Sequence, residues 1–204
     1  VITSEVKRAF TEVRREKFVF HRQSEAISRS NILNAYKESP LDIGYGQTIS
    51  SPNMVAIMTN YCNPQPTDVV LEIGTGSGYQ GAIIAKLVKQ VYSVEIVKPL
   101  GELCTEVFRK NGFTNVTNKV SDGYYGWKEY GPYDKILVTC ATNHIPPDLV
   151  KQLKPGGMML IPVGQPWKVQ QLIEVIKLPD GKTKSKRLMG VKFVPMTGRA
   201  MQGQ

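Results

Sequence analysis

The 204-residue sequence predicts an α/β fold, a doubly wound and mostly parallel sheet covered by helices on both faces. Three observations support this fold class. Short β-branched runs such as "DVVLEIG" and "QVYSVEI" alternate with segments of helical periodicity. Their spacing suits right-handed crossovers between parallel strands. The length of the chain fits one large domain with a single substantial core.

The elements follow one another in a simple order. Amphipathic patterns predict helices at 5–18 and 24–36, and a polar, glycine-rich loop at 39–52 leads into a third helix at 53–61. After this point we expect strands at 68–74, 90–96, 115–123, 133–142 and 158–164, helices at 79–89, 99–112 and 146–153, and a turn at 154–157. The last two runs, 170–178 and 187–198, predict an antiparallel pair added to one edge of the sheet.

Individual residues mark where several of these elements begin or end. Gly112 is a good C-cap for the helix before it. The Pro-Asp-Gly sequence at 179–181 predicts the turn of a hairpin. Ser50 and Ser51 both precede a proline and an apolar helix, and either would serve as its N-cap.

The net formal charge of +9 is concentrated near the C-terminus. Between Gln165 and Gln204 the chain carries eight Lys or Arg residues against two acidic residues. A solvated loop is the favoured interpretation, because no aromatic residues interleave with the charges as they do in nucleic-acid sites. Nucleic acid is therefore not the expected partner, although the charge would also suit an anionic substrate.

The cysteines and the hydropathy indicate a compartment. Cys62, Cys104 and Cys140 lie far apart and form no C-x-x-C pair, which disfavours a disulfide framework or a metal site. No segment approaches the roughly 20 apolar residues that cross a bilayer, and the first residues lack the apolar centre of a signal peptide. We expect a cytoplasmic monomer with no bound metal and no membrane partner.

The most informative stretch is "VLEIGTGSGYQ", in which every second residue after the apolar run is glycine. The pattern is Gly74-x-Gly76-x-Gly78, whereas in a dinucleotide fingerprint the third glycine comes one position later. A P-loop is excluded because no lysine follows the glycines. In open α/β sheets ligands bind at the carboxyl ends of the strands, so this loop should line such a crevice.

Acidic residues follow three successive predicted strands. Glu72 ends the first strand, Glu95 ends the second, and Asp122 follows the third. Glu95 is placed to accept hydrogen bonds from both hydroxyls of a ribose, and Asp122 to reach an adenine amino group. Any one of these acids would serve equally well as a surface or capping residue. Together with the glycines, they predict a ligand that contains a nucleoside.

These motifs resemble the class I methyltransferases that use S-adenosylmethionine. The segments "IGYGQTISSPNMVAIM", "LKPGGMMLIPVG" and "LMGVKFVPMTG" narrow the resemblance to the protein-L-isoaspartate O-methyltransferase family, from about Leu41 to Thr197. The resemblance implies a Rossmann-like fold with a seven-stranded sheet. It also implies S-adenosyl-L-methionine as cofactor, S-adenosyl-L-homocysteine as product, and methylation of L-isoaspartyl carboxylates in damaged proteins and peptides, a repair reaction.

The resemblance also assigns the site by position. The residues that it places at the methionine and ribose end of the cofactor are Glu72, Gly74, Thr75, Gly76, Ser77 and Gly78. It places Glu95 at the ribose hydroxyls and Asp122 with Gly123 at the adenine. Thr48, Ile49 and Ser50 wall the methyl-transfer site, with Thr48 and Ser50 as the catalytic residues, and Thr197 approaches the same site.

We therefore expect one methyltransferase domain over residues 1–204, made of four parts. Residues 1–40 form an N-terminal helical cap and 41–63 a loop and helix on the substrate side. Residues 64–165 form the cofactor-binding core, and 166–204 form the C-terminal antiparallel strands.

The implied chemistry needs few groups. An isoaspartyl carboxylate has an unperturbed pKa of about 4 and is ionised at neutral pH, so no general base is required. Hydroxyl groups such as those of Thr48 and Ser50 would hold the carboxylate by hydrogen bonds without quenching its charge. A lysine or arginine would pair tightly with it and make it a poorer nucleophile. A serine hydrolase is not indicated, since there is no G-x-S-x-G elbow.

The sequence departs from the family pattern at Ser121, which precedes Asp122, and in "CATNHIPP", which places Asn143 and His144 near the rim of the crevice. The segment "FHRQSEAISRSNILNAY" also departs from it. These departures bear on the substrate rather than on the cofactor. Two alternatives stay open. One, suggested by the basic C-terminal hairpin, is a methyltransferase that acts on RNA or a small molecule. The other is a non-catalytic module that keeps the fold and recognises modified proteins.

Overall fold

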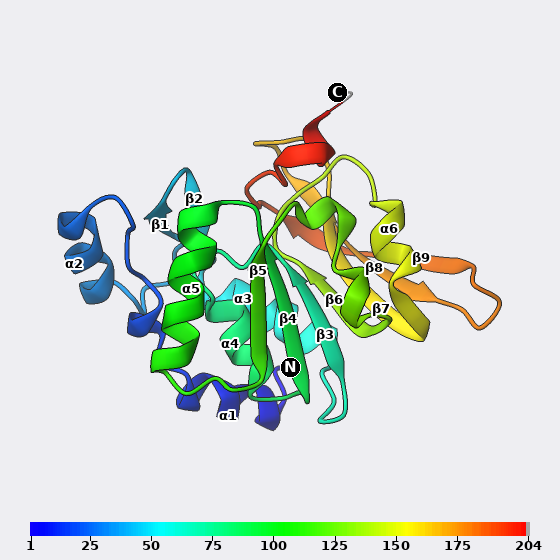
Figure 1. Cartoon of the computed structure of the whole chain (residues 1–204), viewed down its shortest axis with the longest axis horizontal. Coiled ribbons are helices and arrows are strands. Elements are labelled where there is room, and N and C mark those ends of the chain that lie inside the picture. The colour runs from blue at the N-terminus through cyan, green and yellow to red at the C-terminus, as the bar shows by residue number, and fades with distance from the viewer. Residues whose placement is uncertain (203–204) are drawn as a thin grey trace.

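The computed structural model describes residues 1–202 and has a twisted sheet at its centre (Figure 1). The described residues form seven strands in the order β5-β4-β3-β6-β7-β8-β9. Their bounds are β3 Val69–Ile73, β4 Gln90–Glu95, β5 Val116–Val120, β6 Tyr133–Val138, β7 Leu153–Val163, β8 Gln170–Lys177 and β9 Thr183–Val191. The first five strands in this order are parallel, and β8 and β9 are antiparallel to their neighbours. The predicted fold class is confirmed, including the antiparallel pair.

Helices cover both faces of the sheet (Figure 1). One apolar cluster packs α1 (Ser4–Glu12), α3 (Pro52–Cys62), α4 (Tyr79–Ala85) and α5 (Lys98–Lys110) against the sheet. The other cluster includes α6 (Pro147–Lys151) and Trp127, from the region of the short helices η2 (Gly123–Tyr125) and η3 (Lys128–Tyr130). Successive residues of β3 alternate between them, since Val70 belongs to the first cluster and Leu71 to the second. Such a strand is buried on both faces, as the apolar run predicts.

The N-terminal helices are shorter than the sequence predicts. The expected helix at 5–18 ends at Glu12, and a single turn, η1 (Arg15–Lys17), follows after two extended residues, Val13 and Arg14. Arg15 is fully buried in this turn, where its Nε donates to the Ala35 carbonyl and its guanidinium lies 5.0 Å from the ring centre of Tyr79. The second helix, α2 (Glu25–Leu33), begins at its Ser24 N-cap and ends three residues before the expected end. The tertiary contacts of Arg15 therefore divide the predicted helix into α1 and the short turn η1.

The prediction of an irregular loop at 39–52 is wrong, because a two-stranded hairpin lies there. β1 (Leu41–Gly44) pairs antiparallel with β2 (Gln47–Ile49), with a register shift next to the turn. Asn31 on α2 anchors the hairpin, since its Nδ2 donates to the Asp42 carbonyl at 2.7 Å. The strands are only a few residues long, so their stability depends on this tertiary support rather than on a periodic pattern.

Other boundaries shift in the core. The expected helix at 79–89 ends at Ala85, and every residue of α4 is buried. The predicted turn at 154–157 lies inside β7, which starts at Leu153 opposite Tyr133 and continues at Met158 opposite Lys135. These residues bulge out of the ladder, so the turn and the strand coexist. α5 ends close to the predicted position, with Asn111 as C-cap and Gly112 following in a left-handed conformation.

Two further findings concern compartment and membranes. Cys62, Cys104 and Cys140 are buried, free thiols. None of the helices within residues 1–202 has the length and apolar character needed to cross a bilayer.

Candidate active site

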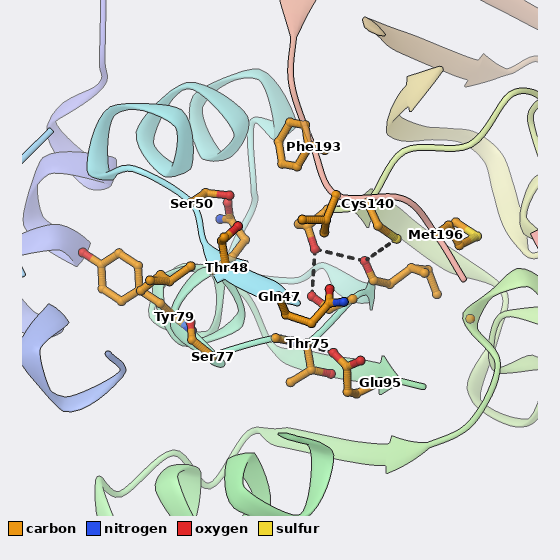
Figure 2. A pocket seen from close by; sticks show the side chains of 18 of the residues that line it. Gln47, Thr48, Ser50, Thr75, Ser77, Tyr79, Glu95, Cys140, Phe193 and Met196 are labelled. Carbon is orange, nitrogen blue, oxygen red and sulfur yellow. Dashed lines mark hydrogen bonds between the residues drawn. The ribbon is translucent and has the colours of Figure 1, made fainter. Parts of the chain in front are cut away.

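A crevice lies at the carboxyl ends of the central strands, as the sequence predicts. The segments that line it include the end of the β1–β2 hairpin with α3, the glycine loop (residues 74–78) up to Ser77, the start of α4, the ends of β4 and β6, Gly123, and a C-terminal strap (residues 193–197). Figure 2 shows how their side chains surround the crevice, with the labelled residues Gln47, Thr48, Ser50, Thr75, Ser77, Tyr79, Glu95, Cys140, Phe193 and Met196. Segments that are distant in sequence thus meet around one cavity.

The glycine loop is held in place by the residue after β6, the strand that pairs with β3. Thr139, directly after β6, donates its hydroxyl to the Gly74 carbonyl at 2.7 Å, and its Oγ1 lies 3.1 Å from the Ile73 carbonyl. Gly74 has φ +95°, and a Cβ there would lie 2.7 Å from the Thr139 Oγ1. A side chain at this position is therefore excluded by both the backbone conformation and the space. Gly78 ends the loop as the N-cap of α4.

Glu95 reaches the loop from the end of β4. Its Oε2 accepts a hydrogen bond from the Gly76 N–H at 2.7 Å, and its Oε1 accepts one from the Val97 N–H at 3.0 Å. The residue is 5% exposed, and burial raises the pKa of its carboxyl, although these backbone donors oppose the rise. Each carboxylate oxygen has a second lone pair, so the side chain retains acceptor capacity toward the crevice. This placement is compatible with the predicted contact to ribose hydroxyls.

Glu72 does not line the crevice. It is 1% exposed beneath the glycine loop, where its Oε1 accepts a hydrogen bond from Ser93 Oγ at 2.6 Å. Ser93 Oγ in turn lies 2.6 Å from Thr75 Oγ1, which does line the crevice. The pKa of Glu72 is raised to about 8, chiefly by burial; the hydrogen bond from Ser93 acts to lower it, and the charge of Glu95 acts to raise it. A direct contact of Glu72 with the cofactor stays a prediction, and the geometry favours an indirect role.

Asp122 and Gly123 follow β5, but only Gly123 lines the crevice. The Asp122 carboxylate accepts hydrogen bonds from the Tyr124 N–H at 2.9 Å and from the Arg199 N–H at 2.8 Å. It thus caps η2 and holds the C-terminal helix η4 (Gly198–Met201) against it. The predicted contact with an adenine amino group would have to use the remaining lone pairs.

The predicted substrate residues lie together. Thr48 and Ile49 on β2 and Ser50 directly after it line the crevice opposite the end of β6 (Figure 2). Ser51, not Ser50, caps α3 by accepting a hydrogen bond from the Met54 N–H at 3.3 Å. Within the described residues, neither the Thr48 nor the Ser50 hydroxyl has a hydrogen-bond partner. Both hydroxyls are therefore available to a ligand.

Thr197 also lines the crevice, at the end of the C-terminal strap. The strap is tied to the segment after β6, since the Ala141 N–H donates to the Val194 carbonyl at 2.8 Å and the Met196 N–H to the Ala141 carbonyl at 2.7 Å. Gln170 on β8 accepts a hydrogen bond from the Phe193 N–H at 2.8 Å. The antiparallel pair thereby brings the end of the chain back over the site.

The sequence did not indicate every lining residue. Gln47, Thr139, Cys140, Phe193 and Met196 line the crevice without having been predicted. Thr139 and Cys140 follow a core strand, as the predicted acids do, and that position was the available signal. The others come from segments whose placement depends on tertiary packing.

Asn143 and His144, expected near the rim, are exposed and lie outside the lining of the crevice. His144 Nε2 lies 2.8 Å from the Tyr124 hydroxyl, and its Nδ1 lies 2.5 Å from Asn143 Oδ1. The three side chains form a surface cluster.

The charge of the crevice is simple. Among the described residues that line it, Glu95 is the one acidic side chain, and none is lysine, arginine or histidine. Burial raises the pKa of Cys140 and raises that of Tyr79 to about 12, so neither group ionises near neutral pH. The walls therefore offer neutral hydroxyl and amide groups beside one carboxylate.

Comparison with known proteins gives one consistent family. The model of the protein-L-isoaspartate(D-aspartate) O-methyltransferase family matches residues 1–201. A protein-L-isoaspartate O-methyltransferase 2 of Syntrophobacter fumaroxidans is 52% identical over 164 residues, covering 80% of this chain and 66% of that protein. Another, of a Polaromonas species, is 49% identical over 175 residues and covers 86% and 83%. The chain thus spans about two thirds of the length of the first relative and more of the second.

Solved structures agree with this. A protein-L-isoaspartate O-methyltransferase aligns over 98% of this chain and 63% of its own length, with a TM-score of 0.85 and 27% identity. A β-aspartate methyltransferase structure from Plasmodium falciparum, in complex with S-adenosyl-L-homocysteine, shares the fold with a TM-score of 0.78 at 24% identity over 97% of this chain and 92% of its own. From its sequence, its fold and its crevice, the chain belongs to the protein-L-isoaspartate(D-aspartate) O-methyltransferase family.

Proposed function

We propose that the chain is an S-adenosylmethionine-dependent carboxyl methyltransferase that methylates the free carboxylate of L-isoaspartyl residues in damaged proteins and peptides. One observation carries the proposal. A crevice with a glycine loop and Glu95 at one end has two free hydroxyls, those of Thr48 and Ser50, at the other, and no cationic side chain lines it among the described residues. Such a site suits a nucleophile that is already an anion.

The residues fit the cofactor. The glycine loop offers close backbone approach, and Glu95 offers a carboxylate acceptor for a ribose diol. We propose that Gly74, Thr75, Gly76, Ser77 and Gly78 hold the methionine and ribose end, with Glu95 at the ribose hydroxyls and Gly123 and Asp122 near the adenine. Within the proposed division of the chain, residues 64–165 bind the cofactor and 41–63 face the substrate. When bound, S-adenosylmethionine supplies an activated methyl group.

The protein contributes orientation at the other end of the crevice. Thr48 and Ser50 would donate hydrogen bonds to the isoaspartyl carboxylate and hold it toward the cofactor end, while Ile49 and Thr197 close the walls. Such donors stabilise the anion without the tight ion pairing that would weaken it as a nucleophile. Fixing two reactants in line lowers the barrier by roughly 7–11 kcal/mol in well-oriented systems. No residue has to remove a proton, because the carboxylate is ionised at neutral pH.

The setting of the reaction is part of the proposal. Three buried, free thiols support work in a reducing compartment, and the cytoplasm is the one we propose. We also propose that the protein acts as a monomer, which light scattering after gel filtration would test.

Methylation of matched peptides tests the function. The protein should transfer labelled methyl groups from S-adenosylmethionine to an isoaspartyl peptide and form base-labile methyl esters. The same peptide with a normal aspartyl residue is the control and should stay unlabelled. Equal labelling of both peptides, or of neither, would contradict the proposal.

The alternatives make different predictions. A methyltransferase for RNA would bind RNA with strong salt dependence, through the lysines of the β8–β9 hairpin. A non-catalytic module would bind S-adenosylhomocysteine in a calorimeter without turnover of any carboxylate.

A further inference from the structure

Glu72 is a buried ionisable group to which the proposed reaction assigns no role. It is 1% exposed, and its Oε2 is buried without a hydrogen-bond partner in the described part of the chain. Its Oε1 has one partner, the hydroxyl of Ser93. An ionised carboxylate in such a place loses its hydration and recovers a single hydrogen bond, so the neutral form is favoured.

No basic group compensates the charge. Among the described residues, the acid Glu95 on β4 is the charged group that acts on Glu72, and it opposes ionisation. The thiols of Cys104 on α5 and Cys140 after β6 also face this region, and burial raises the pKa of each, so both stay neutral. Gly81 on α4 provides the space for the Glu72 carboxyl, since a Cβ at this position would lie 2.8 Å from Glu72 Oε1. The pKa of Glu72 is raised to about 8, chiefly by burial.

A chain of hydrogen bonds leads from Glu72 to the crevice. Ser93 Oγ lies 2.6 Å from Glu72 Oε1 and 2.6 Å from Thr75 Oγ1. Thr75 belongs to the glycine loop and lines the crevice, and its N–H lies 3.3 Å from the Val94 carbonyl. Three oxygens from β3, β4 and the loop are thus linked in series.

The direction of this chain depends on one proton. Ser93 has a single hydroxyl hydrogen. If Glu72 is ionised, Ser93 must donate to Glu72, and Thr75 must then donate to Ser93. If Glu72 carries a proton on Oε1 it donates to Ser93, Ser93 donates to Thr75, and the Thr75 hydrogen is released toward the crevice. The proton comes from solvent, and no covalent bond to carbon changes.

We propose that Glu72 is a positioning residue that acts in its protonated form, and that the chain through Ser93 to Thr75 couples cofactor binding to this protonation. Binding therefore takes up one proton wherever the free protein has lost it. A ligand that presents an oxygen acceptor to Thr75 selects the outward direction of the chain. The inference rests on the proposed function only in taking S-adenosyl-L-homocysteine as the ligand for the test.

The protonation can be measured without any ligand. Infrared spectra near neutral pH should contain the carbonyl band of a protonated carboxyl, and Glu72→Gln should remove it. Glutamine is nearly isosteric with the neutral acid and keeps a donor toward Ser93. A wild-type spectrum that lacks this band, or a variant that keeps it, overturns the proposal.

The coupling is measured by calorimetry with S-adenosyl-L-homocysteine between about pH 6.5 and about pH 9.5. Wild-type affinity should fall about tenfold per pH unit above about pH 8. The heat of binding there should depend on the ionisation enthalpy of the buffer. Glu72→Gln should bind the ligand without this pH dependence. Comparing the wild type with this variant at each pH also removes the contribution of the ligand's own titration.

Two further variants, Ser93→Ala and Thr75→Ser, test the same chain of hydrogen bonds. Their results do not depend on whether Glu72→Gln folds normally. Ser93→Ala keeps the acid but breaks the chain, so its affinity should be lower and should lose the steep alkaline fall. Thr75→Ser keeps the hydroxyl, so its affinity, whatever its absolute value, should show the same alkaline fall as that of the wild type. Wild-type pH dependence in Ser93→Ala, or a flat wild-type profile with buffer-independent heat, overturns the coupling.

Failure of the proposed function looks different. Proton-linked binding of S-adenosyl-L-homocysteine without methylation of isoaspartyl peptides would reject that function and leave the inference standing. Methylation of the peptide together with binding that takes up no proton above about pH 8 would reject the inference and leave the proposed function standing. No binding of S-adenosyl-L-homocysteine at any pH would overturn the inference.

Discussion

Two hydroxyls face the crevice at Thr48 and Ser50, and they differ from the neighbouring Ser51 in having no structural partner. A hydrogen bond to a charged group contributes about 1.5–3 kcal/mol. Ser50→Ala should therefore lower kcat/KM for an isoaspartyl peptide roughly tenfold to a hundredfold. The Kd for S-adenosylhomocysteine should stay close to wild type. Steady-state kinetics and calorimetry check both values.

Ser51→Ala is the matched control for this prediction. It removes the N-cap of α3, so the free energy of unfolding should fall by about 1 kcal/mol while kcat/KM changes little. If Ser51→Ala impairs turnover as much as Ser50→Ala, the hydroxyl of Ser50 has no special role.

The raised pKa of Glu72 also predicts how the free energy of unfolding depends on pH. Its pKa is raised to about 8 in the folded chain, from an ordinary value of 4.5. Between these values the folded state binds one proton more than the unfolded state, so its contribution to stability is complete at low pH and is lost as the pH rises to about 8. The loss is about 1.4 kcal/mol per pH unit.

Urea unfolding of wild type and Glu72→Gln across this range isolates the contribution. The difference in free energy of unfolding, wild type minus variant, should become steadily less favourable to the wild type as the pH rises. A constant difference would show that Glu72 has an ordinary pKa.

The residues of the site show which signals a sequence carries. Glu95, Gly74 and Gly76 were predicted because a glycine loop and an acid after a core strand form a recognisable pattern, and the crevice contains them. Thr139 was not predicted, although its hydroxyl fixes the loop. A threonine after a strand is common, and its partner lies 65 residues away in the chain. Likewise the burial of Glu72 beneath the loop depends on how α4 packs on β3.

Among the elements, η4 is held against η2 by Asp122. Gly198 has φ +81°, and a Cβ there would lie 2.5 Å from Asp122 Oδ2 and 2.6 Å from Ile96 Cδ1. Gly198→Ala should release the end of the chain, because it adds both backbone strain and overlap. Amide hydrogen exchange at Arg199, whose N–H donates to Asp122, should become at least tenfold faster.

Gly181→Ala provides the control for conformation alone. Gly181 lies in the β8–β9 turn with φ +83°, and a Cβ there would meet nothing within 4 Å. This variant should show the same order of strain without any change in exchange at Arg199. Equal exchange in the two variants would mean that η4 does not depend on the contact with Asp122.

Elements with long periodic patterns were predicted better than short ones. The core strands and α5 occupy the predicted segments because burial on one or two faces determines their residue pattern. The β1–β2 hairpin was missed because the Asn31 side chain and the Arg22 N–H bind its backbone, and these contacts are not local in sequence. α1 was predicted too long because the burial of Arg15 against Tyr79 interrupts a pattern that otherwise continues.

For the whole molecule, ligand binding should appear as stability. A ligand that binds only the folded state at about one hundred times its Kd adds about 2.7 kcal/mol to the free energy of unfolding. For a chain of this size each kcal/mol raises Tm by about 2–4 °C, so S-adenosylhomocysteine should raise Tm by roughly 5–11 °C. Differential scanning calorimetry measures the shift.

Adenosine without the amino-acid part is the control ligand. It should raise Tm less at equal concentration, since it lacks contacts at the methionine end. An unchanged Tm with saturating S-adenosylhomocysteine would show that the crevice is not the cofactor site.

The sequence by itself determined the succession of the core strands and helices after residue 63, the family, and the two ends of the crevice, because each follows from periodicity or from a short motif within one segment. Only the tertiary structure decided which groups are free to react. Burial takes Glu72 out of the crevice, the Arg199 N–H occupies Asp122, and capping by Ser51 leaves Ser50 free. The physical reason is that solvation and hydrogen bonding of a side chain depend on neighbours brought together from the whole chain, and no local pattern records them.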